Sequence, residues 1–514
     1  MREAISALNG KHFDIFIVGG GISGASAVQH LAAAGYSALL VEKGDFCSAA
    51  TSRSGRILHC GLRYMAPQKT PWEFLLNPRQ MFTLLNSARQ SILSRTEFLT
   101  ETPERVRPLR LAIPLYKGDP YKPWHVDLGA KMLQVLNPKR FPLEYRRMRP
   151  AEALSMPLLK WLRDPDKLTS VATFLDYQFH WPDRLAMDAV LDAERMGAIA
   201  RNYTKAVEFI RDGENWRFKI EDGVTGETAW VTASQFLNLT GTWIDGINKR
   251  AAPNSTPPRK IVGVKGTHFA VRLPPECKGV SVAGINREGE QIFCMAWGDL
   301  HYIGPTETMF NGDLDRVYPL EEEIEFLLTE INYFLPGINL NRKNVEFAWA
   351  GVRAITFDPK REKGRRIPFS VVQDMHSEGM RDAATVTWSV IMFHRQAGRQ
   401  LVKLIKRRQK PSGEPKRISY AARLFPQNQN SPPIVDGNTA ITAATLRHIA
   451  ETEHPKHLVD ILYRRSGLGW EGSLPPDAVR RAAEAVAGPL GWDATNIEKE
   501  IAAFAAYQKE QHLR

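Results

Sequence analysis

A short stretch near the start of the chain, TSRSGRILHCGLRY from Thr51 to Tyr64, concentrates side chains that bind anions or move protons. It holds three arginines, one histidine and several hydroxyl groups around glycines 55 and 61. Guanidinium groups bind phosphate or carboxylate through paired hydrogen bonds, and imidazole exchanges protons near neutral pH. The stretch is therefore either a solvated loop or an anion site beside a cofactor, and the residues before it decide between the two.

The preceding residues are typical of a dinucleotide-binding unit. Phe13–Val18 is a β-branched and aromatic run that predicts a buried parallel strand, and Ala25–Ala34 predicts a helix of small residues ended by Gly35. A second strand is predicted over Ser37–Val41, directly before Glu42. This order of strand, glycine turn, helix, strand and acid is more specific than a glycine motif alone.

Three glycines in the pattern GxGxxG connect the first strand to the helix. Gly19 permits the tight turn, Gly21 lets the backbone approach a pyrophosphate, and Gly24 allows the helix to pack closely on the strand. We count Ser23, in the same turn, with the cofactor-binding residues, because the positive end of a helix binds phosphate.

The acid after the second strand indicates which dinucleotide is bound. Glu42 lies about 20 residues after the glycines, where a carboxylate accepts hydrogen bonds from ribose hydroxyls. Lys43, next to it, is also assigned to the cofactor site. An acid rather than a base at this point argues against a 2′-phosphate. We expect an ADP-containing cofactor.

Length and composition bound the class of protein. A chain of 514 residues predicts two or three domains, and 43% hydrophobic with 24% charged residues is typical of a soluble globular protein. The four cysteines form no CxxC pair, so we expect a reducing compartment, no disulfide framework and no metal site. The net charge of +12 favours an anionic partner, which is a phosphorylated substrate, a nucleic acid or an acidic membrane face.

The stretch at 51–64 resembles the segment TSSxSSKLIHGGLRYLE of FAD-dependent glycerol-3-phosphate dehydrogenases. The resemblance continues in order through NLTGTWID (238–245), VKGTHFAV (264–271), IGPTET (303–308), WAGVRAI (349–355) and LVDILYRRSGLGW (458–470). These are similar to the family segments NATGPW, KGSH, IGTTD, SGVRPL and D-x-L-x-RR-x-x-LG. The sequence therefore resembles a divergent member of this family along most of its length.

The resemblance implies an α/β fold: a Rossmann-like FAD-binding domain of the glutathione-reductase/D-amino-acid-oxidase type, an inserted α+β substrate domain and a C-terminal helical domain. We expect the FAD-binding domain over 1–70, 181–255 and 345–408, the substrate-binding or cap domain over 71–180 and 256–344, and the helical domain over 409–514. Proline-started Pro475–Ala487 and apolar residues at helical spacing after 493 agree with helices there. Gln409–Arg417 has the composition of a linker.

The implied reaction oxidises the secondary alcohol of glycerol 3-phosphate to dihydroxyacetone phosphate, with electrons passed from FAD to a quinone or another acceptor. The resemblance places six side chains in the catalytic pocket: His59, Arg63, Tyr64, His268, Arg353 and Arg366. The histidines are candidate proton acceptors, and the arginines suit the phosphate. For either histidine the alternative is a packed residue, and for Arg353 it is a structural ion pair; Arg365 leaves the register of Arg366 open.

Several small residues complete the expected cofactor site. Thr51, Ser52 and Ser54 are assigned to the phosphates or the flavin ring, with simple turn capping as the alternative. Gly241, in the segment LTG, is expected to let the backbone approach FAD a second time.

One segment departs from the family pattern. The family's GGKLTTYR corresponds to VTWSVIMFHR at 386–395, so that Trp388 and Ser389 replace glycines and Val390 replaces lysine. Tryptophan does not permit the backbone approach that glycine does, and valine carries no charge. Arg56 is a candidate for the missing cation. Other substrates therefore stay open, namely another polyol phosphate such as a tetritol phosphate, a hydroxy acid or an amine, as does a catalytically degenerate FAD-binding protein.

Two basic stretches, Trp124–Arg149 and Arg399–Lys410, mix apolar residues with lysine and arginine. Each is either an anionic-membrane contact, as suits a quinone-reducing enzyme, or a solvated helix packed on the core. We expect a cytoplasmic protein, free or peripheral on the inner face of the cytoplasmic membrane, with a homodimer left open. No nucleic-acid recognition motif is present, so nucleic acid is not expected as a partner.

Overall fold

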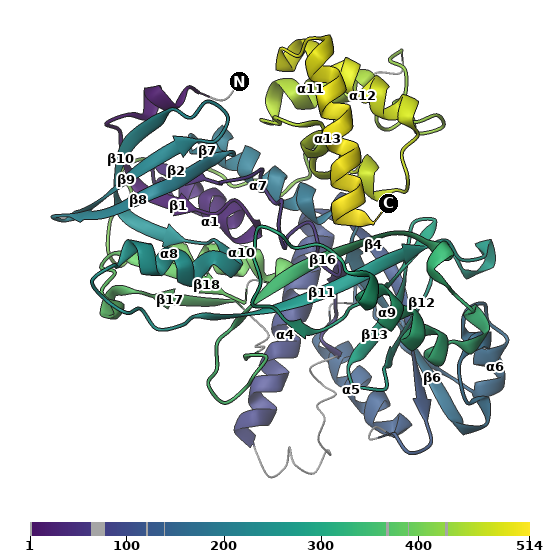
Figure 1. Cartoon of the computed structure of the whole chain (residues 1–514). Coiled ribbons are helices and arrows are strands. Elements are labelled where there is room, and N and C mark those ends of the chain that lie inside the picture. Colours follow the sequence, from purple (N-terminus) through teal and green to yellow (C-terminus); the bar gives the residue numbers. More distant parts are fainter. Residues whose placement is uncertain are drawn as a thin grey trace.

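The computed structural model describes residues 3–62, 78–119, 122–137, 139–365, 370–388, 390–426 and 430–513. Within them, two β-sheets lie beside each other, and a group of helices near the C-terminus sits above the junction (Figure 1). The N-terminal sheet is at the left of Figure 1 and the second sheet at the lower right.

The first sheet is built around β1 (His12–Val18), which is buried at every position after His12. Such continuous burial is typical of a parallel strand covered on both faces. The strand order is β17-β18-β10-β1-β2-β7, and β1 pairs in parallel with both neighbours. The other strands are β2 (Ala38–Val41), β7 (Ile199–Arg201), β8 (Thr204–Asp212), β9 (Asn215–Asp222), β10 (Thr228–Asn238), β17 (Val371–Asp374) and β18 (Ala383–Thr387).

Helix α1 (Ile22–Ala33) follows β1 and contacts both α7 (Pro182–Arg195) and α10 (His394–Ile405). Gly24, Ala25, Ser26, Ala27 and Ala32 are buried, so that small side chains let the three helices approach one another. The predicted strand, helix and second strand of the dinucleotide unit are therefore present, and the helix begins at Ile22 rather than at residue 25. The short helix α8 (Ile244–Ala251) follows β10.

The second sheet has the order β15-β11-β14-β13-β12-β4-β6-β3, with β16 paired to β11 and β5 to β6. Strand β11, which pairs with β14, β15 and β16, is buried along its whole length. The strands are β3 (Ile57–Leu58), β4 (Val106–Tyr116), β5 (Arg146–Met148), β6 (Leu168–Phe179), β11 (Ile261–Val271), β12 (Val280–Ile285), β13 (Gln291–Trp297), β14 (Leu300–Gly304), β15 (Thr308–Met309) and β16 (Val345–Thr356). The helices between them are α4 (Pro78–Glu101), α5 (Pro123–Leu136), α6 (Pro150–Leu154) and α9 (Glu321–Phe334).

The C-terminal region is helical, as expected. It contains α11 (Ala443–Thr452), a π-helical turn (Asp460–Arg465), α12 (Pro476–Leu490) and α13 (Ala494–His512). The segment expected to be a linker lies along the first sheet, because Gln409 Nε2 donates to Asp14 Oδ1 at 2.9 Å and the Lys416 amide donates to the Ala33 carbonyl at 2.8 Å. Strands of both sheets alternate along the chain, and the limits given above for the three domains stay a prediction.

Candidate active site and cofactor site

The glycine turn after β1 leaves no space for side chains at two of its positions. Gly19 has φ of +106°, and a Cβ there would lie 2.6 Å from the Leu239 carbonyl oxygen. A Cβ on Gly24 would lie 1.8 Å from the carbonyl oxygen of Gly19. Gly19 therefore makes the tight turn, and Gly24 brings α1 against β1.

Two other glycines border open space, which is where a cofactor phosphate would fit. A Cβ on Gly21 would meet only Thr51 Oγ1, at 3.3 Å, and one on Gly241 would meet no described atom within 4 Å. The Ile22 amide, at the start of α1, donates to Thr51 Oγ1 at 3.0 Å, and Ser23 follows in the first turn. The helix terminus and the two glycines fit a dinucleotide pyrophosphate.

Glu42 is held at the end of β2 by the glycine turn. Its Oε2 accepts a hydrogen bond from the Gly20 amide at 2.6 Å, and its Oε1 accepts one from the Gly44 amide at 3.0 Å. Burial raises the pKa of Glu42, and these two amides counteract the rise. The carboxylate is thus fixed beside the turn, at the position that a ribose-binding acid requires.

Lys43 has other partners. Its ammonium group pairs with Asp315 and lies 4.3 Å from the centroid of the Trp243 ring. Both charged groups of the ion pair are well exposed. The structure therefore places Lys43 in a surface contact.

The hydroxyl groups after β2 bond to nearby backbone. Thr51 accepts from the first amide of α1, Ser52 Oγ donates to the Ala49 carbonyl at 3.0 Å, and Ser54 Oγ accepts from the Arg56 amide at 3.3 Å. These are the contacts of turn capping, the alternative given above. Their assignment to FAD stays a prediction.

The two arginines of the 51–64 stretch that the structure describes, Arg53 and Arg56, contact other groups of the protein. Arg53 Nη1 donates to the carbonyls of Val317 at 2.6 Å and Ala350 at 3.2 Å. Both carbonyls belong to segments that are remote in sequence, so Arg53 ties the stretch to the second sheet.

Arg56 is buried, and its guanidinium lies 4.0 Å from the ring centroid of Trp297 and 4.9 Å from that of Trp470. Its Nη1 donates to the His180 carbonyl at 2.9 Å. Burial lowers the pKa of Arg56 to about 10. A buried guanidinium that packs over two indole rings in this way is a packing element. The hypothesis that Arg56 replaces the missing lysine is therefore not supported.

The stretch also touches β11 and β14. Tyr302 Oη donates to the Gly55 carbonyl at 2.7 Å, and a Cβ on Gly55 would lie 3.5 Å from His268 Nε2. The loop that leaves the dinucleotide turn therefore runs directly onto the strands that carry His268 and Arg353.

His268 lies within β11 and is 3% exposed. Its ring stacks on Trp349, with centroids 5.1 Å apart and 10° between the planes. Burial, with the charges of Arg353 and Arg56, lowers the pKa of His268 to about 3. This is the environment of the packed-histidine alternative, and the imidazole is neutral at pH 7.

Arg353 lies on β16 with 29% of its side chain exposed. Its guanidinium packs over Gly266, where a Cβ would lie 2.3 Å from Nη2. Nη1 pairs with Glu307 Oε1 at 3.4 Å, which is the ion pair given above as the alternative for Arg353. The absent side chain of Gly266 thus makes room for the guanidinium above β11, between the buried core and solvent.

His59 directly follows β3 and is half-buried. Arg63, Tyr64 and Arg366 lie outside the described residues, as does Ser389. The structure places His268 and Arg353 on the paired strands β11 and β16, where His268 lies opposite Trp349 and Arg353 opposite Val264, next to the stretch that carries His59.

Trp388 stands where the segment GGKLTTYR has a glycine, and it adopts a backbone conformation that glycine favours. Its φ is +50°, and its amide donates to the Ala354 carbonyl at 3.2 Å. The indole packs against an apolar cluster that includes Val262 and Ile355. The turn therefore has a left-handed conformation at a residue type that adopts it only with strain.

A pocket of about 620 Å³ opens beside β17 and α10. Its lining includes Thr356, Arg365, Ser370 and Lys403. Arg365, the alternative to Arg366 in the sequence register, is part of this lining, whereas the site residues predicted within the described part of the chain are not.

Sequence reasoning missed a buried ion cluster formed by Asp45 with Arg464 and Arg465. The two arginines lie in the motif LVDILYRRSGLGW, but Asp45 is 420 residues from Arg465. No local pattern signals a pairing over that separation.

Comparisons with known proteins agree with this geometry. A family model described as FAD dependent oxidoreductase matches residues 14–380. A glycerol-3-phosphate dehydrogenase of Synechocystis sp. is 28% identical over 406 residues, covering 76% of this chain and 69% of that protein. An aerobic glycerol-3-phosphate dehydrogenase of Staphylococcus haemolyticus is 24% identical over 416 residues, covering 80% and 70%.

Two solved structures show the same fold. The glycerol-3-phosphate dehydrogenase of Bacillus halodurans, complexed with FAD, has a TM-score of 0.70 at 18% identity and covers 99% of this chain and 96% of its own. The L-alpha-glycerophosphate oxidase of Mycoplasma pneumoniae has a TM-score of 0.57 at 14% identity and covers 80% and 98%. The predicted fold class is confirmed, with FAD as the cofactor. The chain belongs to the FAD-dependent oxidoreductase family.

Proposed function

We propose that this protein oxidises glycerol 3-phosphate to dihydroxyacetone phosphate. The observation that carries the proposal is the partly exposed Arg353 guanidinium, held over Gly266 on the strands that meet the loop from the dinucleotide turn. Relatives that align over three-quarters of the chain or more are named for this substrate. When bound, FAD accepts the hydride that leaves the alcohol carbon.

Arg353 and His59 perform the two remaining tasks, phosphate binding and proton removal. Arg353 binds the phosphate, because a guanidinium fork matches its oxygens. His59 takes the hydroxyl proton, since the burial that lowers the pKa of His268 to about 3 leaves that imidazole a weak base at neutral pH. His268 supports the site by stacking on Trp349.

Anaerobic mixing with glycerol 3-phosphate tests the proposal. We expect the absorbance of the oxidised flavin to bleach, and R353K to require about tenfold more substrate for half-maximal bleaching, because lysine cannot bind phosphate through a fork. R272K is the matched control, because Arg272 directly follows β11 and pairs with Glu346 of β16 at 3.5 Å. Equal effects of the two variants would contradict the role of Arg353.

The departures at Trp388 and Val390 favour one alternative, a larger or differently charged polyol phosphate. Bleaching by a tetritol phosphate and not by glycerol 3-phosphate would select it. A flavin that stays oxidised with every polyol phosphate and hydroxy acid would indicate a degenerate FAD-binding protein.

We further propose a quinone as the electron acceptor and peripheral attachment to an anionic membrane. Among the described residues, no helix is both long and apolar enough to cross a bilayer. Helix α5, within the first of the two basic stretches, exposes Trp124, Leu128 and Val135. The homodimer stays a prediction.

A further inference from the structure

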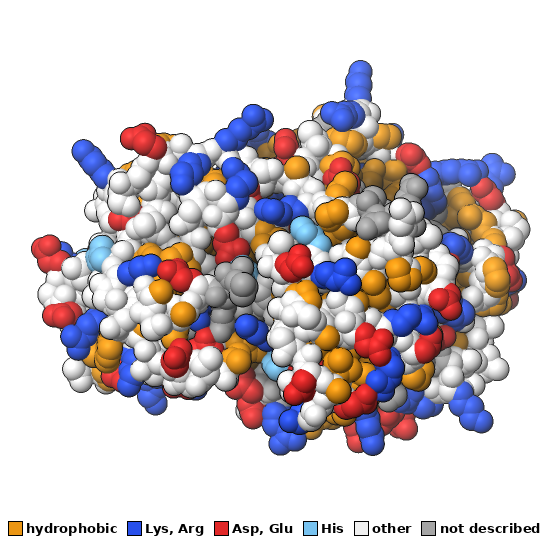
Figure 2. Space-filling model, turned by 90° about the horizontal axis from the view of Figure 1, so that it is seen from above, with side chains coloured by type: hydrophobic (Ala, Val, Ile, Leu, Met, Phe, Trp, Pro, Cys, Tyr) orange, Lys and Arg blue, Asp and Glu red, His pale blue; other side chains and the backbone are white. Residues whose placement is uncertain are grey.

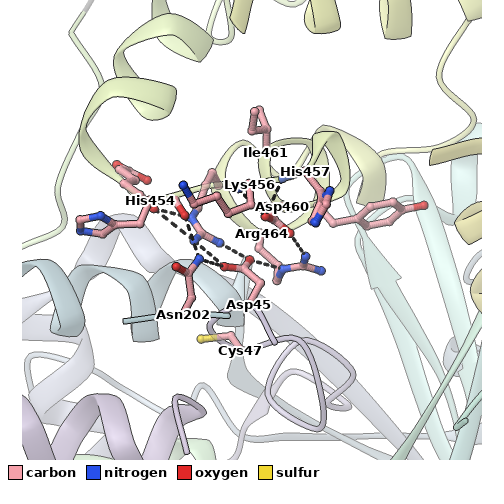
Figure 3. A network of polar contacts seen from close by, with 12 residues as sticks. Asp45, Cys47, Asn202, His454, Lys456, His457, Asp460, Ile461 and Arg464 are labelled. Carbon is pink, nitrogen blue, oxygen red and sulfur yellow. Dashed lines mark hydrogen bonds and ion pairs between the residues drawn. The ribbon is translucent and has the colours of Figure 1, made fainter. Parts of the chain in front are cut away.

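A buried ion cluster joins the C-terminal helices to the loop after β2 (Figure 3). Asp45 Oδ2 accepts from Arg464 Nε at 2.5 Å, and Arg465 binds both carboxylate oxygens of Asp45, at 2.5 and 2.7 Å. Arg464 also pairs with Asp460, and each of these four side chains is at most 4% exposed. Two positive and two negative charges thus compensate one another away from solvent.

Neutral partners satisfy the cluster further. Asn202 Nδ2 donates to Asp45 Oδ1 and to the His454 carbonyl, both at 2.8 Å. Tyr203 Oη donates to Asp460 Oδ1 at 2.8 Å. Burial alone would raise the pKa of Asp45, but Arg465 and Arg464 outweigh it and hold that pKa well below its usual range. The carboxylate is therefore ionised whenever the cluster is intact.

The loop that carries Asp45 also carries Glu42. The Tyr203 amide donates to the Gly44 carbonyl at 2.7 Å, and the Cys47 amide donates to the Gly20 carbonyl at 3.1 Å. Glu42 accepts from the Gly20 amide at 2.6 Å. One side of the 42–47 loop is thus fixed to the C-terminal helices, and the other side to the glycine turn.

Removing one partner of such a cluster leaves an uncompensated buried charge, which the structure avoids by moving. Asp45 and Glu42 lie three residues apart on the same loop, so a displacement of Asp45 is passed along the chain to Glu42. A shift there would displace the Glu42 carboxylate from the Gly20 amide.

We propose that Arg464 and Arg465 are positioning residues for the cofactor: through Asp45 they hold the 42–47 loop in the conformation in which Glu42 binds the ribose of FAD. Docking of the C-terminal helices and binding of FAD therefore favour each other. By linkage, each event stabilises the other by the same factor. The proposal rests on FAD as the cofactor and is independent of which alcohol is oxidised.

The test compares R465K with R184K in the full-length apoprotein. Arg184 of α7 is also buried, and it ties the C-terminal region to α7 through both carboxylate oxygens of Glu453, which directly follows α11. It also pairs with Asp188 within α7 at 3.0 Å and has no recorded bond to the 42–47 loop. Lysine keeps the charge and loses the fork in both variants. FAD is titrated by the change in flavin fluorescence, and thermal unfolding of each apoprotein is recorded.

We expect both variants to unfold at lower temperature, and only R465K to weaken FAD binding, by about tenfold. R184K should stay within about twofold of the original dissociation constant. The proposal is wrong if both variants weaken FAD binding equally, or if R465K binds FAD with unchanged affinity.

If R465K does not fold, hydrogen exchange of the unaltered protein tests the same coupling between the C-terminal helices and FAD binding. Adding FAD to the apoprotein should slow exchange of the amides at 460–466, although these residues make no predicted contact with FAD. Unchanged exchange there, with slower exchange around Gly19–Gly24, would overturn the coupling while leaving FAD binding intact.

Discussion

Individual polar residues of the 51–64 stretch have roles that their types do not reveal. Arg53 and Arg56 have the chemistry of anion binding, yet Arg53 bonds to backbone carbonyls and Arg56 packs over the indoles of Trp297 and Trp470. The sequence predicted the crowding of these side chains next to a cofactor loop. It could not predict which of them face inward, because that depends on Trp297 and Trp470, which are far away along the chain.

His268 offers a test at this scale. The unfolded chain protonates this imidazole near its ordinary pKa of 6.5, whereas the folded protein does so only near 3. Between these values the unfolded state binds one more proton, so stability is lost as the pH falls below about 6.5. H268Q should make the fall in unfolding free energy from pH 6 to pH 5 shallower by up to about 1.4 kcal/mol per pH unit.

Urea unfolding of both proteins at pH 7.5, 6.0 and 5.0 measures this difference. Parallel pH dependences would show that the imidazole is accessible to protons in the folded state. The pKa of the acid limb of kcat/KM should be the same in H268Q, since His59 takes the proton in the proposed reaction.

At the scale of elements, local patterns predicted well and distant pairings did not. β1, α1 and β2 follow from consecutive residues, and their observed limits differ from the expected ones by at most three residues at either end. The sequence of α10 allowed two interpretations, a membrane contact and a helix packed on the core. The complete burial of Leu401 and Ile405 shows that its apolar face lies in the core. The pairing of β16 with β11 joins segments about 80 residues apart, which no local period encodes.

The turn before α10, at Trp388, gives a prediction about FAD affinity and stability. A left-handed residue other than glycine costs roughly 1–2 kcal/mol, and Trp388 accepts that strain while its indole packs on Val262 and Ile355. W388G should bind FAD severalfold more tightly, because the backbone can then approach the cofactor, although the lost packing lowers Tm.

W388A separates strain from packing, because it removes the indole and keeps a Cβ. We expect W388G to be more stable than W388A by about 1 kcal/mol in urea unfolding. Equal stability of the two would show that the turn relaxes away from positive φ once the indole is gone.

The order of motifs along the chain predicted the family and the helical C-terminal region of the whole molecule. It did not predict how that region docks, because the contacts of Asp45 span almost the entire sequence. The net charge of +12 likewise did not predict where on the surface an anionic partner would bind. Seen from above, basic side chains are spread over the face and interleaved with acidic ones (Figure 2).

Helix α5 is the surface that we expect to bind the membrane. Trp124 is 51% exposed, Leu128 49% and Val135 86%, and their spacing places them on one side of the helix with the exposed Lys131. The protein should sediment with anionic vesicles at low salt and be released at high salt. W124S combined with L128S should abolish sedimentation, and L424S, which alters an exposed leucine elsewhere, should not. A protein that stays in the supernatant with these vesicles at low salt is not a surface binder.

The cluster around Asp45 also constrains how the molecule is made. The dinucleotide unit is synthesised well before the arginines that neutralise its buried carboxylate, because Asp45 and Arg465 are 420 residues apart. An emerging polypeptide can form β1, α1 and β2 early, yet the loop that receives the ribose acquires its final shape only when the C-terminal helices fold back onto it. Under the coupling proposed above, the loop reaches its FAD-binding conformation only after Arg464 and Arg465 have been synthesised, and a chain that stops short of Arg464 retains every glycine of the fingerprint but lacks the means to fix the loop beside it.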